Sequence, residues 1–142
     1  MTQPDAIRIE YEGEPVAKGR PRLGRAGIYT PSKTLQFEHN LAWVARSQIK
    51  QPLFGPILLE VSFRLPRPKE TKFLYPPKPD LDNLIKYLDA LNGIAWKDDS
   101  QIATIWGAKR YCLTSEKPGI SIAIWPLGDF KASFAIGLKP QL

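Results

Sequence analysis

Residues Lys78–Ile102 read KPDLDNLIKYLDALNGIAWKDDSQI, a stretch that combines a helical apolar pattern with a cluster of acids. Leucine and isoleucine recur at spacings of three and four residues along its first half, which predicts an amphipathic helix over Asp80–Asn92. Pro79 stands directly before this helix and Gly93 directly after it, as expected at a helix start and a helix stop.

The charged residues of this helix allow a structural interpretation. Asp82, Lys86 and Asp89 are spaced at i, i+4 and i+7, so their side chains share one polar stripe beside the apolar face. In this interpretation Asp80 caps the helix and Asp82 interacts favourably with the helix dipole. Lys86 then pairs with the two aspartates of the stripe.

The same residues also allow a functional interpretation as a metal site. Asp80 and Asp82 can converge on one hard cation, because an N-cap residue has extended backbone and need not follow the helical phase. Mg²⁺ takes oxygen ligands and usually only one or two carboxylates, with water and substrate phosphate completing its shell. If the next strand runs beside the helix start, Asp98 or Asp99 completes a site of three carboxylates. Lys86 would then neutralise the phosphate or orient the attacking water.

The rest of the chain adds four predicted strands and a second helix. Strands are predicted where apolar and polar residues alternate or β-branched residues cluster, and a proline after a threonine marks the helix start. The expected elements are strands over Ala6–Glu12, Ile57–Leu65, Gln101–Cys112 and Ile120–Trp125, and a helix over Pro31–Ile49. The last two strands flank the turn-like sequence TSEKPG and are expected to form a hairpin. The stretch KGRPRLGRAGIYTP predicts a loop or an irregular ribbon.

The order of these elements indicates an α+β fold. Strands and helices are mixed without the strict alternation of a doubly wound fold. We expect a single compact domain over residues 1–126, with a small mixed sheet packed against two main helices. We expect residues 127–142 to form a C-terminal tail that docks either on this core or on a partner chain.

Composition excludes several classes of protein. The chain has 142 residues and a formal net charge of +6, with a pI near 9.5. Its single cysteine cannot form an intramolecular disulfide, and one cysteine with one histidine cannot build a typical zinc site. The N-terminus lacks the pattern of a signal peptide, and the longest apolar runs are too short to span a bilayer. These features predict a cytoplasmic protein that does not associate with a membrane.

The charges are unevenly distributed along the chain. Val16–Lys50 contains seven basic residues and one acid, whereas Pro79–Asp99 contains five aspartates and two lysines. A cationic surface beside a carboxylate cluster is typical of a metal-dependent enzyme that acts on phosphodiesters, because one part holds phosphates and the other holds cations. The alternative is an ordinary charged and solvated surface.

The acidic segment resembles the signature of the RusA family of Holliday junction resolvases. That signature is Asp-Leu-Asp-Asn-Leu-x-Lys, then Asp-Ala-Leu, then an Asp-Asp pair before a strand. The matching residues here are Asp80–Lys86, Asp89–Leu91 and Asp98–Ile102. Gly19–Arg22 and Tyr29–Pro31 also resemble RusA-like proteins, so the resemblance covers most of residues 6–125.

The resemblance implies a homodimeric endonuclease of RusA-like fold that acts in DNA recombination and repair. Such an enzyme depends on Mg²⁺, with Mn²⁺ as an alternative ion, and cuts four-way DNA junctions by paired symmetric nicks. Carried over by position, the metal-binding carboxylates are Asp80, Asp82 and Asp99, and the catalytic lysine is Lys86. Asp98 is the less favoured ligand of the acid pair.

Contacts with DNA are expected from basic and aromatic residues. The residues expected to hold phosphates are Lys18, Arg20, Arg22, Arg25, Lys72 and Lys78. Most of the four tryptophans are expected in the core, and Trp96, beside the acid pair, is the one expected at the surface, where it could stack on an unpaired base. Two alternatives stay open: a DNA-binding protein that does not cleave, and a different phosphotransfer enzyme that uses aspartates and a metal.

Overall fold

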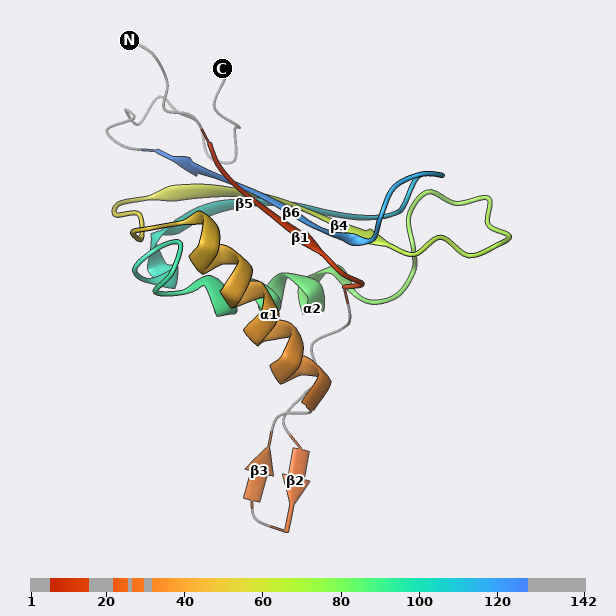
Figure 1. Cartoon of the computed structure of the whole chain (residues 1–142), viewed down its shortest axis with the longest axis horizontal. Helices are drawn as coiled ribbons and strands as arrows, with labels where there is room; N and C mark the ends of the chain where they lie inside the picture. The colour runs from red at the N-terminus through yellow and green to blue at the C-terminus, as the bar shows by residue number, and fades with distance from the viewer. Residues whose placement is uncertain (1–5, 16–21, 26, 30–31, 128–142) are drawn as a thin grey trace.

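The chain folds around a four-stranded mixed sheet (Figure 1). The computed structural model describes residues 6–15, 22–25, 27–29 and 32–127. The strands of the sheet are β1 (Ile7–Glu12), β4 (Ile57–Leu65), β5 (Ile102–Tyr111) and β6 (Gly119–Pro126), in the order β1-β6-β4-β5. β6 runs antiparallel to both β1 and β4, whereas β5 runs parallel to β4. The predicted α+β class and the four predicted strands are confirmed.

The predicted hairpin of the last two strands is wrong. β4 lies between β5 and β6, so the turn that follows β5 joins two strands that are not neighbours. β4 fits the central place because most of its side chains are buried. β5 fits the edge because its side chains are exposed or half-buried along its whole length.

Helices cover one face of the sheet. α1 (Ser32–Gln48) and α2 (Leu81–Ile85) lie on the same side of it (Figure 1). The apolar face of α1 packs toward the sheet, because Phe37, Leu41 and Ala45 are buried. Two short strands, β2 (Arg22–Gly24) and β3 (Gly27–Tyr29), pair as a separate two-stranded ribbon at the far end of α1, within the stretch predicted as a loop or irregular ribbon.

The main core lies between the helices and the sheet. Phe63 of β4, Tyr87 and Trp96 are its largest fully buried side chains. The ring of Tyr87 packs against Phe37 of α1, with centroids 4.4 Å apart. The crossover between β4 and β5 therefore supplies two of the three largest side chains of the core and is held firmly under the sheet.

The helix predicted over Asp80–Asn92 consists of two helices of different kinds. α2 ends at Ile85, and a 3₁₀ helix, η1 (Lys86–Leu91), continues from it. Leu84, Leu88 and Leu91 are buried and Leu81 is half-buried, but the tighter 3₁₀ turn also buries Tyr87, which lies outside the stripe given by α-helical spacing.

Two expectations concern the end of the chain and the membrane. Residues 128–142 of the predicted tail lie outside the described residues. The N–H of Leu127 donates to the carbonyl oxygen of Pro56 at 2.9 Å, so the tail starts from a fixed point. In the part of the chain that the structure describes, no helix has the length and apolar character needed to cross a membrane.

An ion pair holds the turn between β5 and β6. The two terminal nitrogens of Arg110 donate to the two carboxylate oxygens of Glu116, at 2.6 and 2.7 Å. The N–H of Leu113 donates to the same carboxylate at 3.0 Å. The hydrogen bonds from Arg110, followed by the one from Leu113, lower the pKa of Glu116 from 4.5 to about 2.

We expect this pair to make stability depend on pH in acid. A carboxyl whose pKa is lower in the folded state stabilises the fold above its unfolded pKa of 4.5, and this contribution is lost as the pH falls through about 2. Glu116→Gln should therefore flatten the pH dependence of the urea unfolding midpoint between these two values. Glu12→Gln, which changes an exposed acid on β1, should leave that dependence as it is. Equal profiles for wild type and Glu116→Gln would contradict the assignment.

Candidate active site

Asp80 stands at the start of α2 with an exposed carboxylate. Its own backbone is extended, as predicted for an N-cap residue, with φ −64° and ψ 140°. Within the described residues, however, its side chain makes no capping hydrogen bond. Lys78 Nζ lies 3.5 Å from Asp80 Oδ1, and both side chains are exposed. The structural interpretation of Asp80 as a side-chain cap is therefore wrong, and its carboxylate faces solvent beside a lysine.

Asp82 and Lys86 flank Asn83 on the first turns of the helix. The N–H of Asn83 donates to Asp82 Oδ1 at 3.0 Å, and Lys86 Nζ donates to the side-chain oxygen Oδ1 of Asn83 at 3.3 Å. Asn83 thus connects the second carboxylate to the lysine. Asn83 belongs to the motif quoted above, but spacing alone assigned it no role.

A hollow of about 570 Å³ opens beside Asp80. Lys78, Asp80 and Asn83 line it from the α2 side, and Tyr111 lines it from the end of β5. Glu14, which follows β1, adds a second carboxylate to this hollow. No sequence pattern pointed to Glu14, because it lies far from the acidic segment along the chain and reaches the hollow only through the fold.

Asp99 lies in a different environment from Asp80. It begins the 3₁₀ helix η2 (Asp99–Gln101), and its Oδ1 accepts a hydrogen bond from the indole Nε1 of the buried Trp96 at 2.8 Å. The side chain of Gln101 donates to the carbonyl oxygens of Leu53 and Gly55, both at 2.9 Å. These bonds fix Asp99 near the start of β4 and β5.

Asp98 has a structural role instead. Its carboxylate accepts hydrogen bonds from the backbone and side chain of Ser100 and caps η2, while Gln101 completes a capping box. The hydrogen bonds from Ser100 lower the pKa of Asp98 below its usual value. The Asp98 carboxylate is therefore used to cap η2.

The structure does not bring Asp99 to Asp80 and Asp82 within one chain. Lys109, near the end of β5, donates to the carbonyl oxygen of Pro79 at 2.8 Å, so Asp80 lies at that end. Asp99 precedes the first residue of β5. At about 3.3 Å per residue, the length of strand between these points is roughly 20 Å.

The first two carboxylates nevertheless match what Mg²⁺ prefers. Among the described residues, no group of three His, Cys, Asp or Glu side chains is placed to hold a metal ion. Asp80 and Asp82 form an exposed pair of hard oxygen donors, and Mg²⁺ takes one or two carboxylates, with water and phosphate as its other ligands. The donor chemistry of this pair therefore fits the ion.

The predicted DNA-binding residues are only partly described. Lys18 and Arg20 lie outside the described residues. Arg22 belongs to β2, and the exposed Arg25 lies in the turn from β2 to β3. Lys72 and Lys78 are exposed in the segment that precedes Asp80.

Comparison with known proteins identifies the family of the chain. A family model described as endodeoxyribonuclease RusA matches residues 12–125. The chain belongs to the RusA endodeoxyribonuclease family. It is also 34% identical to the uncharacterized protein YqaN of Bacillus subtilis (strain 168), in an alignment that covers 84% of this chain and 96% of that relative. The match to the RusA family includes all the acids of the candidate site and the lysine.

The tryptophans of this RusA-family chain are placed differently from the prediction. Trp96 is fully buried, so the expectation that it is exposed is wrong. Its indole fills the core and uses its N–H to hold Asp99. Trp43 on α1 is 70% exposed, although it was expected in the core. The contact between Trp96 and Asp99 depends on the fold, and residue spacing contains no signal for it.

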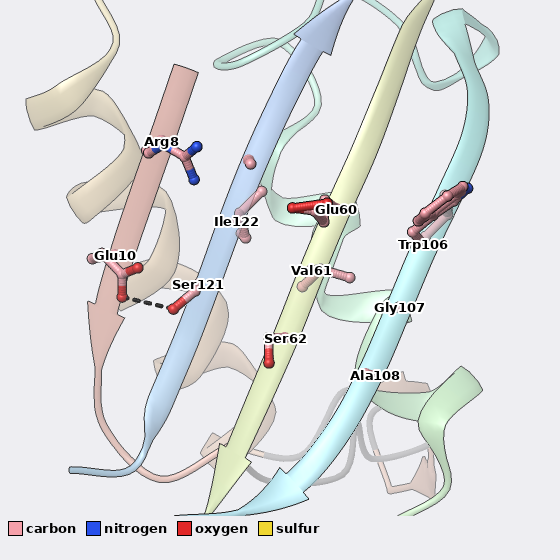
Figure 2. Close-up of a pocket in the computed structure, with 12 residues that line it drawn as sticks. Arg8, Glu10, Glu60, Val61, Ser62, Trp106, Gly107, Ala108, Ser121 and Ile122 are labelled. Atoms are coloured by element: carbon pink, nitrogen blue, oxygen red, sulfur yellow. Dashed lines mark hydrogen bonds between the residues drawn. The ribbon is translucent and has the colours of Figure 1, made fainter. Parts of the chain in front are cut away.

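A second hollow of the RusA-family chain, about 670 Å³, lies away from the carboxylates (Figure 2). It lies on the face of the sheet opposite the helices, where Arg8, Glu10, Glu60 and Trp106 are among its lining residues. Ser121 donates to Glu10 Oε2 at 2.9 Å across this face. No residue predicted for the site lines this hollow, so the smaller hollow at Asp80 is the candidate active site.

We expect the hydrogen bond between Trp96 and Asp99 to stabilise the fold independently of any metal. Asp99→Ala leaves the indole N–H without its acceptor and should lower the free energy of unfolding by about 1–3 kcal/mol. Asp99→Asn keeps an oxygen that can accept the bond and should stay within about 0.5 kcal/mol of wild type. Urea unfolding with EDTA present measures both values. Equal losses in the two variants would show that the bond adds nothing to stability.

Proposed function

We propose that this RusA-family endodeoxyribonuclease is a cytoplasmic, Mg²⁺-dependent enzyme that resolves four-way DNA junctions by paired symmetric nicks in recombination and repair. The observation that carries the proposal is the pair Asp80 and Asp82, two exposed carboxylates whose chemistry fits Mg²⁺, beside Lys86 and a basic segment. Asp80 does not cap the helix with its side chain, as the structural interpretation requires.

Asp80 and Asp82 would hold the cation, with Mn²⁺ able to replace Mg²⁺ on the same oxygen donors. When bound, the ion activates water for in-line attack on the phosphodiester and offsets charge on the leaving oxygen. The protein supplies the rigid helix start on which the two carboxylates stand, and the buried face of η1 fixes that helix against the core.

Lys86 would act on the phosphate that is cut. Its ammonium group lies one helical turn from Asp82 and is held by the side-chain oxygen of Asn83. A cation at this position can neutralise the phosphate or orient the attacking water. The hydrogen bond to Asn83 reduces the number of positions that the long side chain must search.

The basic residues would hold the DNA arms. Lys72 and Lys78 lie in the segment that leads into Asp80, so phosphates bound there would pass close to the carboxylates. Lys18, Arg20, Arg22 and Arg25, the predicted bases of the front segment, would add further contacts with phosphates. Such contacts orient DNA without reading its sequence.

A homodimer would explain why Asp99 stands apart. A four-way junction has two-fold symmetry, so a C2 pair of chains presents one site to each of two strands. In the described part of the chain β5 pairs with β4 alone, and its outer edge is free of proline over ten residues. Antiparallel pairing of two such edges would set the start of each β5 beside the end of the other. Asp99 of each chain would then join Asp80 and Asp82 of the other.

The first test is cleavage of a synthetic four-way junction. Asp82→Asn should lower Mg²⁺-dependent nicking by about a hundredfold or more, because a metal ion contributes several kcal/mol to the transition state. Binding of the junction should persist. Glu12→Gln, which removes an exposed carboxylate from β1, serves as the control and should cut normally. Equal cutting of linear duplex would refute junction resolution, and binding without cleavage by wild type in Mg²⁺ or Mn²⁺ would identify a DNA-binding protein.

The second test asks whether the site combines two chains. Asp82→Asn and Asp99→Asn chains should each be inactive alone, but their mixed dimer should nick one strand of the junction. Both changes fall in the same composite site of that dimer, which leaves the other site intact. A site built within one chain predicts no activity in the mixture. Sedimentation of the wild-type chain as a monomer would contradict the homodimer.

A further inference from the structure

We propose that the Pro66–Pro79 loop recognises the branch point of the DNA, with Phe73 and Tyr75 stacking on base faces that a junction makes accessible. This inference rests on the proposed function and names the element that selects its substrate. The loop joins β4 to α2 and extends beyond the end of the sheet (Figure 1).

Three consecutive large apolar side chains are exposed on this loop. Phe73 is 71% exposed, Leu74 40% and Tyr75 63%. Scattered exposed apolar residues are ordinary, but two aromatic rings within three residues form a patch of the kind found at binding sites. Keeping these rings in water is unfavourable, so a function that uses them is the simplest explanation for their position.

The charges around the rings favour DNA over an apolar protein partner. The loop carries four exposed bases, Arg67, Lys69, Lys72 and Lys78, and one exposed acid, Glu70. Aromatic rings set among basic residues are typical of surfaces that bind unpaired nucleotides, because bases stack on the rings while phosphates meet the cations. An apolar partner would gain nothing from four cations around its contact.

The loop is held in place where it passes the sheet. Lys109 Nζ donates to the carbonyl oxygens of Pro77 and Pro79, at 3.2 and 2.8 Å. The N–H of Tyr111 donates to the carbonyl oxygen of Leu74 at 2.8 Å. The backbone between the two rings is therefore anchored to the end of β5, which lowers the entropy that binding must remove.

The anchor also brings the loop backbone to the candidate active site, because Tyr111, which holds Leu74, lines the hollow at Asp80. Pro79, which Lys109 holds, directly precedes Asp80. DNA that contacts the rings would consequently pass the carboxylates within a few nucleotides. Base faces in a continuous duplex are covered by their neighbours, whereas those at a branch point can be uncovered at lower cost. Stacking on Phe73 and Tyr75 would thus favour a junction over a duplex.

The experiment compares binding to a four-way junction with binding to a linear duplex of the same arm sequence, in EDTA so that neither DNA is cut. The junction carries 2-aminopurine beside the branch point, which reports unstacking by its fluorescence. The variants are the double change Phe73→Ala with Tyr75→Ala and the aromatic exchange Phe73→Tyr with Tyr75→Phe. Trp43→Ala is the matched control, because that ring is equally exposed but lies on α1.

We expect the double alanine variant to bind the junction about tenfold or more weakly than wild type, as stacking losses of this kind produce. Its affinity for duplex should change less than twofold, and the fluorescence increase seen with wild type should disappear. The aromatic exchange and Trp43→Ala should behave as wild type.

Two results would overturn the inference. One is a junction preference that survives in the double alanine variant, and the other is an equal loss on junction and duplex. A wild-type chain that binds both DNAs equally would instead refute the proposed function, so the two failures can be told apart.

Discussion

Parallel pairing of β5 with β4 is the constraint on which the arrangement of the site depends. Two parallel neighbours cannot be joined by a tight turn, so the chain must return from the end of β4 to the start of β5. That return passes beneath the sheet and contains the exposed loop, α2, η1 and η2. Asp80, Asp82 and Asp99 lie on it, at one end of β5 or the other. Tyr87 and Trp96 of this crossover are fully buried in the core. The same core packing therefore also holds the residues of the candidate site in place.

Local sequence patterns were sufficient to predict the strands and helices, but not which strands lie side by side in the sheet. The bounds of β4 follow from an apolar run between Pro56 and Pro66, and α1 begins and ends within one residue of its prediction. The pairing of β5 with β6 could not be excluded from the turn-like sequence between them, because a strand from elsewhere in the chain lies between the two. Which strand is central depends on burial summed over the whole sheet, and that sum is not contained in any short window.

The part of the candidate site that lies within one short segment of the chain was predictable from the sequence. The start of α2 follows from Pro79 and the leucine spacing, and with it the position of Asp80 and Asp82 at the first turn of that helix. The position of Asp99 was not predictable, because the motif counts residues and contains no information on the path between them. The burial of Trp96 was not predictable for the same reason, because its indole N–H has a partner only when η2 is folded against it. Glu14 and Lys109 reach the candidate site only through the fold, and no sequence motif marks either residue.

The two hydrogen bonds from Lys109 to the carbonyl oxygens of Pro77 and Pro79 also divide the crossover into two parts. The part before these hydrogen bonds starts at the end of β4 and ends at the prolines that Lys109 holds. Insertions or exchanges in this part therefore need not move α2. The part after these hydrogen bonds carries the carboxylates and packs into the core through Tyr87 and Trp96. Descendants of one ancestral enzyme could therefore vary the first part, and with it the shape of DNA that they accept, while the reaction chemistry stays the same. Under the two proposals above, a single lysine on an edge strand would make substrate choice and bond cleavage separable in evolution.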